Sequence, residues 1–278
     1  MMRILLNILV FFIIAQLLGV YTGFVILSDM PENPYVQQFV ITEEKEEVGN
    51  AVLLFLYVLF GAALLLVLIR FYKGELLFRI IEFIVVSSAS SIVFYSVFRL
   101  FFGYGESVGI GIVLGLLLAG LKFFKPSLKN AAAIIATAGV GVVFGISLGV
   151  FSVVVLLVLL SIYDYIAVFR TRHMVKMAEF ITKRELAFTV TSRRMVPEEK
   201  RERRIDLGSG DLIGPLMLEV SLLSYSIVAS AFVFVGATLA LGGLLVFMWR
   251  KKIVLPALPP IAFGALLFLA IGFLTGFY

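Results

Sequence analysis

Four acidic residues lie inside otherwise apolar stretches of the chain: Glu82, Asp164, Asp211 and Glu219. An acid within a membrane span costs about 2.5 kcal/mol or more, so each is a candidate for a functional role. Asp164 and Asp211 differ from Glu82 in having no basic residue near them in their own apolar stretch. Two aspartates that share one proton can activate a water molecule and protonate a leaving amide nitrogen. The pair therefore indicates hydrolysis of an amide by acid–base catalysis.

A second interpretation of the pair is open. Membrane-embedded acids also serve as proton relays or ion sites in transporters. A transporter of that kind would show an inverted repeat, whereas here the span acids without a basic neighbour gather in the second half and no convincing internal repeat is visible. A third interpretation, a purely structural protein, does not explain why two acids would lie at the same depth in the membrane, as is argued below for Asp164 and Asp211.

The other charged residues in these stretches have simpler interpretations. Glu82 follows Arg79 by three residues, a helical spacing at which the two side chains can neutralise each other. Arg99 lies near the end of its apolar stretch, where a long side chain can reach the interface. Glu219 follows Asp211 by eight residues, on roughly the same helix face. It is either part of a substrate path or the partner in a buried structural hydrogen bond.

The composition requires a solvent other than water for most of the surface. Of the 278 residues, 62% are apolar and 15% are charged, with a mean hydropathy of +1.11. Soluble domains have about 45–50% apolar and about 25% charged residues. The sequence has no cysteine, which excludes a thiol nucleophile. Its single histidine, His173, excludes a His-Glu-x-x-His zinc site, and the absence of a Gly-x-Ser-x-Gly motif excludes a nucleophile-elbow hydrolase. The sequence therefore predicts no metal and no organic cofactor.

The spacing of the charges divides the chain into membrane spans of about 20 residues each. An uncharged run of 34 residues, 130–163, is too long for one span and is best broken near 145–149. We predict an all-α membrane protein with nine transmembrane helices: 4–28, 49–69, 77–102, 108–124, 131–145, 149–169, two helices within 208–249 with a turn near 226–230, and 254–275.

The charges of the connections predict the orientation. Segment 29–47 holds six acids and one base, whereas segment 170–206 holds eleven Lys or Arg and six Asp or Glu. Because basic residues concentrate on the cytoplasmic side, we expect 170–206 to be a partly flexible cytoplasmic loop, the N-terminus to be cytoplasmic and the C-terminus extracytoplasmic. Residues 1–130 then form a helical scaffold and residues 131–278 the catalytic half.

This arrangement puts the two aspartates at the same depth. Asp164 comes six residues before Arg170, and Asp211 comes five residues after Asp206. At 1.5 Å per residue, both lie roughly 8–9 Å from the cytoplasmic boundary. Their helices are consecutive and antiparallel, so the two carboxyl groups can face each other.

Three short motifs surround the pair. Asp211 ends a Gly-Ser-Gly-Asp sequence at 208–211, where two glycines permit close backbone approach. Asp164 follows Tyr163. A proline-rich segment, 255–260, again begins near the predicted cytoplasmic face. Its missing backbone donors suit a helix start, and they also leave an extended edge that a substrate strand could join.

In this order and on these spans, Tyr-Asp, Gly-x-Gly-Asp and Pro-Ala-Leu resemble the motifs of the presenilin and signal peptide peptidase family of intramembrane aspartyl proteases. The resemblance covers essentially the whole chain. It implies that Asp164 and Asp211 are the catalytic pair. It also implies that the site is shaped by Tyr163, Gly208 and Gly210, and that substrate is bound by Pro256, Ala257 and Leu258. Ser209 departs from the bulkier apolar residue common in the family, which leaves cleavage-site preference open.

The resemblance also implies the setting of the reaction. The distribution of bases favours a presenilin-like orientation, which implies single-span membrane-protein substrates whose N-terminus is outside. The short connections suit a compact stand-alone homologue of the prokaryotic kind, so no obligate protein partner is implied. We expect an integral multi-pass protein of the cell membrane in a prokaryote, or of an endomembrane in a eukaryote. The net charge of +5 reports topology and not nucleic-acid binding.

Overall fold

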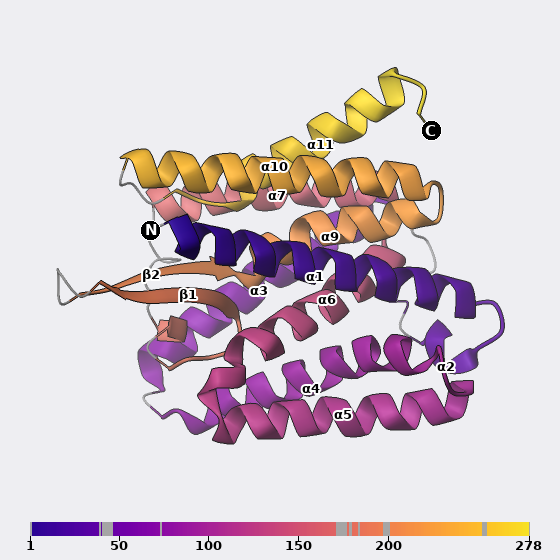
Figure 1. Cartoon of the computed structure of the whole chain (residues 1–278), viewed down its shortest axis with the longest axis horizontal. Coiled ribbons are helices and arrows are strands. Elements are labelled where there is room, and N and C mark those ends of the chain that lie inside the picture. The colour runs from indigo at the N-terminus through magenta and orange to yellow at the C-terminus, as the bar shows by residue number, and fades with distance from the viewer. Residues whose placement is uncertain are drawn as a thin grey trace.

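A computed structural model describes residues 2–38, 40, 47–72, 74–170, 177, 180–182, 184–196, 201–251 and 255–277. Figure 1 shows a bundle of helices that run mostly along its long axis, with a β-hairpin that extends past one end. The N-terminus lies at the same end as the hairpin.

The described part of the chain contains nine helices of 15 residues or more, and each coincides with a predicted span. Seven of them are long and apolar enough to cross a membrane, and α9 and α11 are shorter. The chain is thus an integral multi-pass membrane protein, while the count of nine spans and the orientation stay predictions. The helices are α1 (Met2–Asp29), the short α2 (Pro34–Gln37), α3 (Val48–Phe71), α4 (Leu76–Phe98), α5 (Tyr104–Phe124), the 3₁₀ turn η1 (Pro126–Leu128), α6 (Lys129–Ser147), α7 (Val150–Phe169), α9 (Ser209–Leu223), α10 (Ile227–Lys251) and α11 (Leu258–Leu274).

The hairpin is the main departure from the expected all-α fold. Strands β1 (Thr189–Val196) and β2 (Arg201–Gly208) pair antiparallel, with Thr191 opposite Asp206. A two-stranded ribbon is marginally stable alone, and here a side chain of α6 supports it. The Asn130 amide donates to the Thr191 carbonyl at 2.7 Å and accepts from the Thr191 N–H at 2.9 Å. The outer edge of β1 is thereby occupied at this residue.

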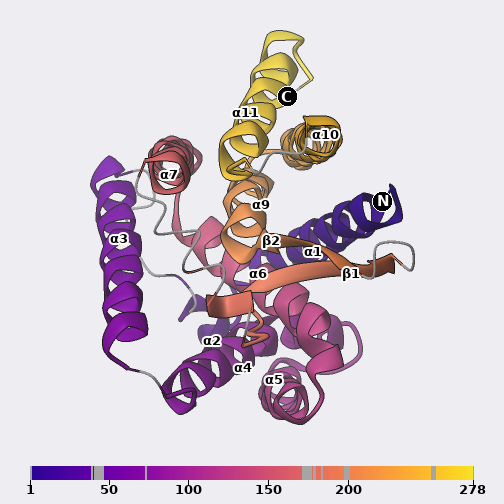
Figure 2. The ribbon, with the colours of Figure 1, turned by 90° about the vertical axis from the view of Figure 1, so that its left-hand side faces the viewer.

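Helix α9 lies at the centre of the bundle and contacts α1, α6, α7, α10 and α11. Glycines allow this close approach, because a Cβ at Gly141 or Gly145 would come within 3.0 Å of Leu216 or Val220 of α9. In contrast, α3 packs chiefly against α7 and stands at the margin of the bundle in the end-on view (Figure 2). Asp211 is therefore on the central helix α9, and Asp164 is on α7, which contacts α3, α9 and α11.

Glu82 of α4 is paired differently from the sequence prediction. Arg79 bonds Glu75 at 3.2 Å, one turn earlier in the chain. Glu82, which is 3% exposed, forms an ion pair with Lys122 of α5 and accepts the backbone N–H of Ala187, just before β1. The predicted pairing with Arg79 was wrong because the partner that reaches the buried carboxylate comes from a neighbouring helix.

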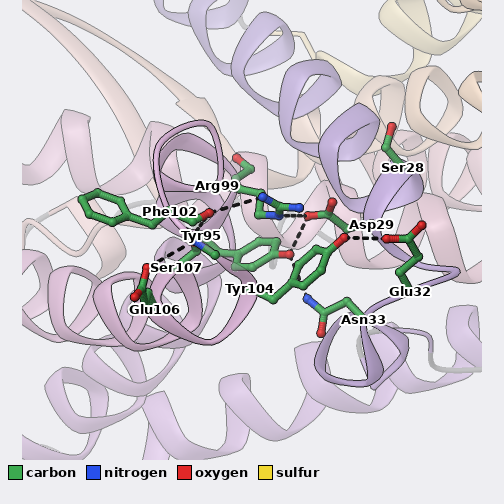
Figure 3. A network of polar contacts seen from close by, with 12 residues as sticks. Ser28, Asp29, Glu32, Asn33, Tyr95, Arg99, Phe102, Tyr104, Glu106 and Ser107 are labelled. Atoms are coloured by element: carbon green, nitrogen blue, oxygen red, sulfur yellow. Dashed lines mark hydrogen bonds and ion pairs between the residues drawn. The ribbon is translucent and has the colours of Figure 1, made fainter.

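At the end of the bundle opposite the hairpin, a polar network joins α1 to α4 and α5 (Figure 3). Asp29 is buried and its Oδ2 accepts from the Tyr95 hydroxyl at 2.6 Å and from Arg99 Nε at 3.0 Å. Arg99 also stacks on Tyr104, with its guanidinium carbon 4.0 Å from the ring centroid. Arg99 thus has a carboxylate partner that its place in the sequence did not indicate.

Candidate active site

Asp164 lies in α7, five residues before the helix ends at Phe169. It is the only charged residue in an otherwise apolar helix, and 4% of it is exposed. Among the described residues its Oδ2 has no hydrogen-bond partner. A buried carboxyl oxygen without a donor is costly in any protein. Asp164 is therefore placed where folding alone does not require an acid.

Asp211 occupies the third position of α9, whose first residue is Ser209. Its Oδ2 accepts the backbone N–H of Gly208 at 3.2 Å, so the carboxyl caps the start of its own helix. A Cβ at Gly208 would lie 3.2 Å from this oxygen, whereas a Cβ at Gly210 would meet nothing within 4 Å. Gly208 therefore leaves room for the carboxyl, and packing within the structure does not explain Gly210.

A cavity of about 290 Å³ contains both aspartates. Tyr163, Gly210 and Leu258 line it as well, together with mostly apolar side chains of α3, α6, α7 and α9. Tyr163 also packs edge-on against Phe55 of α3, with ring centroids 6.4 Å apart. No Lys, Arg or His is among the described residues that line the cavity. The two predicted residues are thus brought together without a base to neutralise either.

The Pro-Ala-Leu segment enters the site through its last residue. Leu258 is the first residue of α11, and its backbone N–H is within hydrogen-bonding reach of both carboxyl groups. Its side chain packs against α9, since a Cβ at Gly214 would lie 2.8 Å from Leu258 Cδ1. Pro256 and Ala257 precede Leu258 in the chain and do not line the cavity of the aspartates.

A second, larger cavity of about 670 Å³ adjoins the first at Ser209 and Gly210. Its walls come from α3, α7 and the hairpin, and Gly208 and Leu255 also line it. Because these walls are largely apolar, the cavity suits an apolar chain next to the aspartates.

Sequence reasoning missed two contributors to this site. Strand β2 runs directly into Gly208, so the hairpin sets the direction from which the chain reaches Asp211. The run of β-branched residues from Thr189 to Thr191 was the available signal, but the surrounding charges obscured it. No sequence pattern could indicate the role of the Leu258 N–H, because a backbone N–H donor does not depend on the type of side chain.

Glu219 is fully buried, and neither of its carboxyl oxygens has a hydrogen-bond partner among the described residues. The structural hydrogen bond considered for it is therefore not seen there. It also lines neither of the two cavities at the aspartates. In the described residues no group of three or more His, Cys, Asp or Glu side chains is placed to hold a metal ion.

The model of the family described as signal-peptide peptidase, presenilin aspartyl protease matches residues 9–277. The chain belongs to this family. A solved structure of a presenilin family intramembrane aspartate protease in space group C222 is similar, with 24% identity, a TM-score of 0.71, and coverage of 98% of this chain and 99% of that one. A structure of a presenilin family intramembrane aspartate protease in space group P2 has 24% identity, a TM-score of 0.63, and coverage of 94% and 96%. A comparison with curated proteins gives no match.

Membership of this family and the shared fold support intramembrane aspartate protease activity, on membrane-protein substrates within the bilayer. The predicted family and the multi-pass membrane location are confirmed.

Proposed function

We propose that the chain is an intramembrane aspartyl endopeptidase that hydrolyses peptide bonds within transmembrane segments of membrane proteins, with Asp164 and Asp211 as its catalytic pair. The observation that carries this assignment is the common apolar cavity of the two carboxyls, with the Leu258 N–H in reach of both. Tyr163, Gly208 and Gly210 shape the site, and Pro256 to Leu258 bind substrate. Water is the nucleophile, and no cofactor takes part.

The pair works with one proton between its two carboxyls. The ionised carboxylate takes a proton from water as the water oxygen bonds to the peptide carbon, and the protonated carboxyl gives its proton to the carbonyl oxygen. In the second step the first carboxyl protonates the amide nitrogen, the C–N bond breaks, and the other carboxylate recovers a proton from a hydroxyl of the diol. The products are a carboxylic acid and an amine, and the pair returns to its starting state.

The substrate enters as a helix and must unwind, because helical amides are hydrogen-bonded and wrapped by side chains. The larger cavity beside Gly208 to Gly210 supports this step, since it can receive an apolar segment next to the aspartates. The unwound segment pairs with the backbone that leads into α11 at Pro256 to Leu258. Substrates are single-span proteins whose N-terminus is outside, and no obligate protein partner is required.

The topology that fits this reaction has nine spans with a cytoplasmic N-terminus and an extracytoplasmic C-terminus. The hairpin end is then cytoplasmic, which agrees with the excess of basic residues in 170–206. Residues 131–278 carry both aspartates, and residues 1–130 act mainly as a scaffold. Leu54 and Val58 of the first part also contribute a wall to the cavity.

The decisive test uses the full chain in phosphatidylcholine liposomes with a single-span substrate, and mass spectrometry to identify the fragments. Asp164→Asn and Asp211→Asn should each abolish cleavage. Glu219→Gln is the matched control, because it changes a buried carboxyl of the same helix outside the cavities, and it should keep cleavage. Cleavage that survives either Asn change would contradict the assignment. Acid-dependent ion flux without cleavage would instead favour a proton-coupled transporter or cation leak channel that uses the same acids.

Two further measurements test the steps. A substrate with glycine in its span should be cut faster than a poly-leucine span, because glycine weakens the helix by about 1 kcal/mol per residue. Equal rates would count against unwinding.

Cleavage should also fall about tenfold per pH unit once the shared proton is lost at alkaline pH. A cleavage rate that stays level at alkaline pH would contradict the shared proton.

A further inference from the structure

A polar cavity of about 550 Å³ lies at the hairpin end of the bundle, separate from the two cavities at the aspartates. It is lined by Asn7 and Phe11 of α1, by the η1–α6 junction, by Glu185 and by β1, and α1, α6 and β1 contact one another at this end. Figure 2 shows the hairpin in front of α1 and α6. Its charged lining residues are Lys129, Glu185 and Arg193, and its polar ones include Asn7, Ser127 and Asn130.

Lys129 is the unusual residue of this cavity. It is 2% exposed, and its ammonium donates to the Thr191 hydroxyl at 2.9 Å. The structure describes no carboxylate within 4.0 Å of this nitrogen. An ammonium has three donors, so two remain for groups in the cavity. A buried cation with only a neutral partner is costly unless an anion or water completes its shell.

The nearby carboxylates are engaged with other cations. Asp206 bonds Arg204 at 2.7 Å, and Glu185 bonds Arg193 at 2.7 Å. The Arg193 guanidinium holds the pKa of Glu185 below its ordinary value, so this acid is ionised and already neutralised at neutral pH. The cluster of Lys129, Arg193 and Arg204 with Glu185 and Asp206 thus keeps one excess positive charge, at the buried ammonium.

We propose that this cavity binds a phosphate group, held by the Lys129 ammonium with polar donors of the α1, η1 and β1 walls. A phosphate offers several acceptor oxygens to one cation and neighbouring hydroxyl or amide donors. Lys129 begins an apolar helix, which is the level at which lipid phosphates lie at a membrane surface. The source is therefore an anionic lipid headgroup or phosphate from solution.

Occupancy would stabilise the hairpin, because Lys129 also holds Thr191 of β1. Thr191 lies opposite Asp206 of β2, and β2 leads to Gly208. The bound group should therefore raise the thermal unfolding midpoint of the protein. This readout and a binding readout do not depend on proteolysis, so failure here and failure of the proposed protease activity are distinguishable.

The test uses the purified full chain in nanodiscs of phosphatidylcholine with or without phosphatidylglycerol, and native mass spectrometry to measure retained phosphatidylglycerol. Lys129→Met should weaken retention by about tenfold or more, the loss expected for one charge-assisted hydrogen bond. Lys125→Met is the matched control, because Lys125 is exposed at the same end and does not line the cavity. Equal losses in the two variants, or none in Lys129→Met, would overturn the proposal.

A second variant covers the case in which Lys129→Met does not fold. Ser127→Glu brings a carboxylate to the exposed rim of the cavity as a built-in counter-ion, and it should abolish selective retention without lowering the unfolding midpoint. Unchanged retention would overturn the proposal.

A further experiment adds inorganic phosphate at matched ionic strength and measures the thermal unfolding midpoint. Stabilisation by phosphatidylglycerol alone identifies a lipid headgroup, stabilisation by inorganic phosphate identifies a soluble source, and no stabilisation by either refutes the site.

Discussion

Asp29 and Asp164 are both buried aspartates in one helical bundle, and their surroundings differ in hydrogen-bond donors. Asp29 accepts from Tyr95 and Arg99 within the network of Figure 3. Asp164 has one oxygen without any partner among the described residues, and it shares an apolar cavity with a second acid. A partnered acid can be explained by packing, whereas an unpartnered one lowers stability and calls for a function. The same residue type thus indicates structure at one end and chemistry at the other.

The largest expected effect concerns the aspartate pair. Asp164→Asn should lower cleavage by about 10²–10⁴-fold, the range typical for loss of an acid–base group. Its thermal unfolding midpoint should stay the same or rise, since no donor loses its acceptor and an amide replaces a buried acid. Activity and differential scanning fluorimetry on the same preparation check this. A large fall in the midpoint would remove the contrast with Asp29.

The next effect concerns the ion pair of Glu82 and Lys122. Glu82→Ala should lower the free energy of unfolding by about 3–5 kcal/mol, because it leaves Lys122 buried without its counter-charge. The double variant Glu82→Leu/Lys122→Leu removes both charges and should recover much of the loss. Denaturation in sodium dodecyl sulfate measures both variants. If the double variant is no more stable than the single one, the unpaired lysine is not the cause.

A smaller loss is expected at Asp29. Asp29→Asn weakens the charge-assisted bonds from Tyr95 and Arg99 and should cost about 2 kcal/mol of stability. The folded protein should cleave substrate at the wild-type rate, since this network lies at the opposite end from the hairpin. The ratio of activity to folded protein, measured at a temperature below both unfolding transitions, checks the result. A selective loss of cleavage would tie this network to the active site.

The smallest effect should come from the exposed pair of Glu75 and Arg79. Glu75→Gln should change stability by less than about 0.5 kcal/mol, because solvent screens exposed ion pairs. The same denaturation assay used for Glu82 gives a direct comparison of an exposed and a buried pair. A loss as large as that of Glu82→Ala would show that pairing at Arg79 matters after all.

Much of the fold was predictable because it depends on local composition. Apolar runs bounded by charges predicted all nine long helices, including a break within 208–249, which the structure places at Ser224 to Ser226 and the prediction put slightly later. The hairpin was not predicted, because its strands carry dense charges and depend on Asn130 of a distant helix. The sequence also predicted that Asp164 and Asp211 can face each other, and the structure brings both into one cavity. Their equal depth in the membrane stays a prediction.

By itself, the sequence determined that this protein has the bilayer as its solvent, which segments form its long helices, and which acids have no base nearby in the chain. The tertiary structure decided which acids find partners in space: Glu82 pairs with Lys122, Asp29 pairs with Arg99, and Asp164 lines an apolar cavity together with Asp211. The reason is that burial and helix formation follow from short-range patterns. Ion pairing depends on the relative positions of helices whose contacting residues lie 40 to 70 apart in the chain.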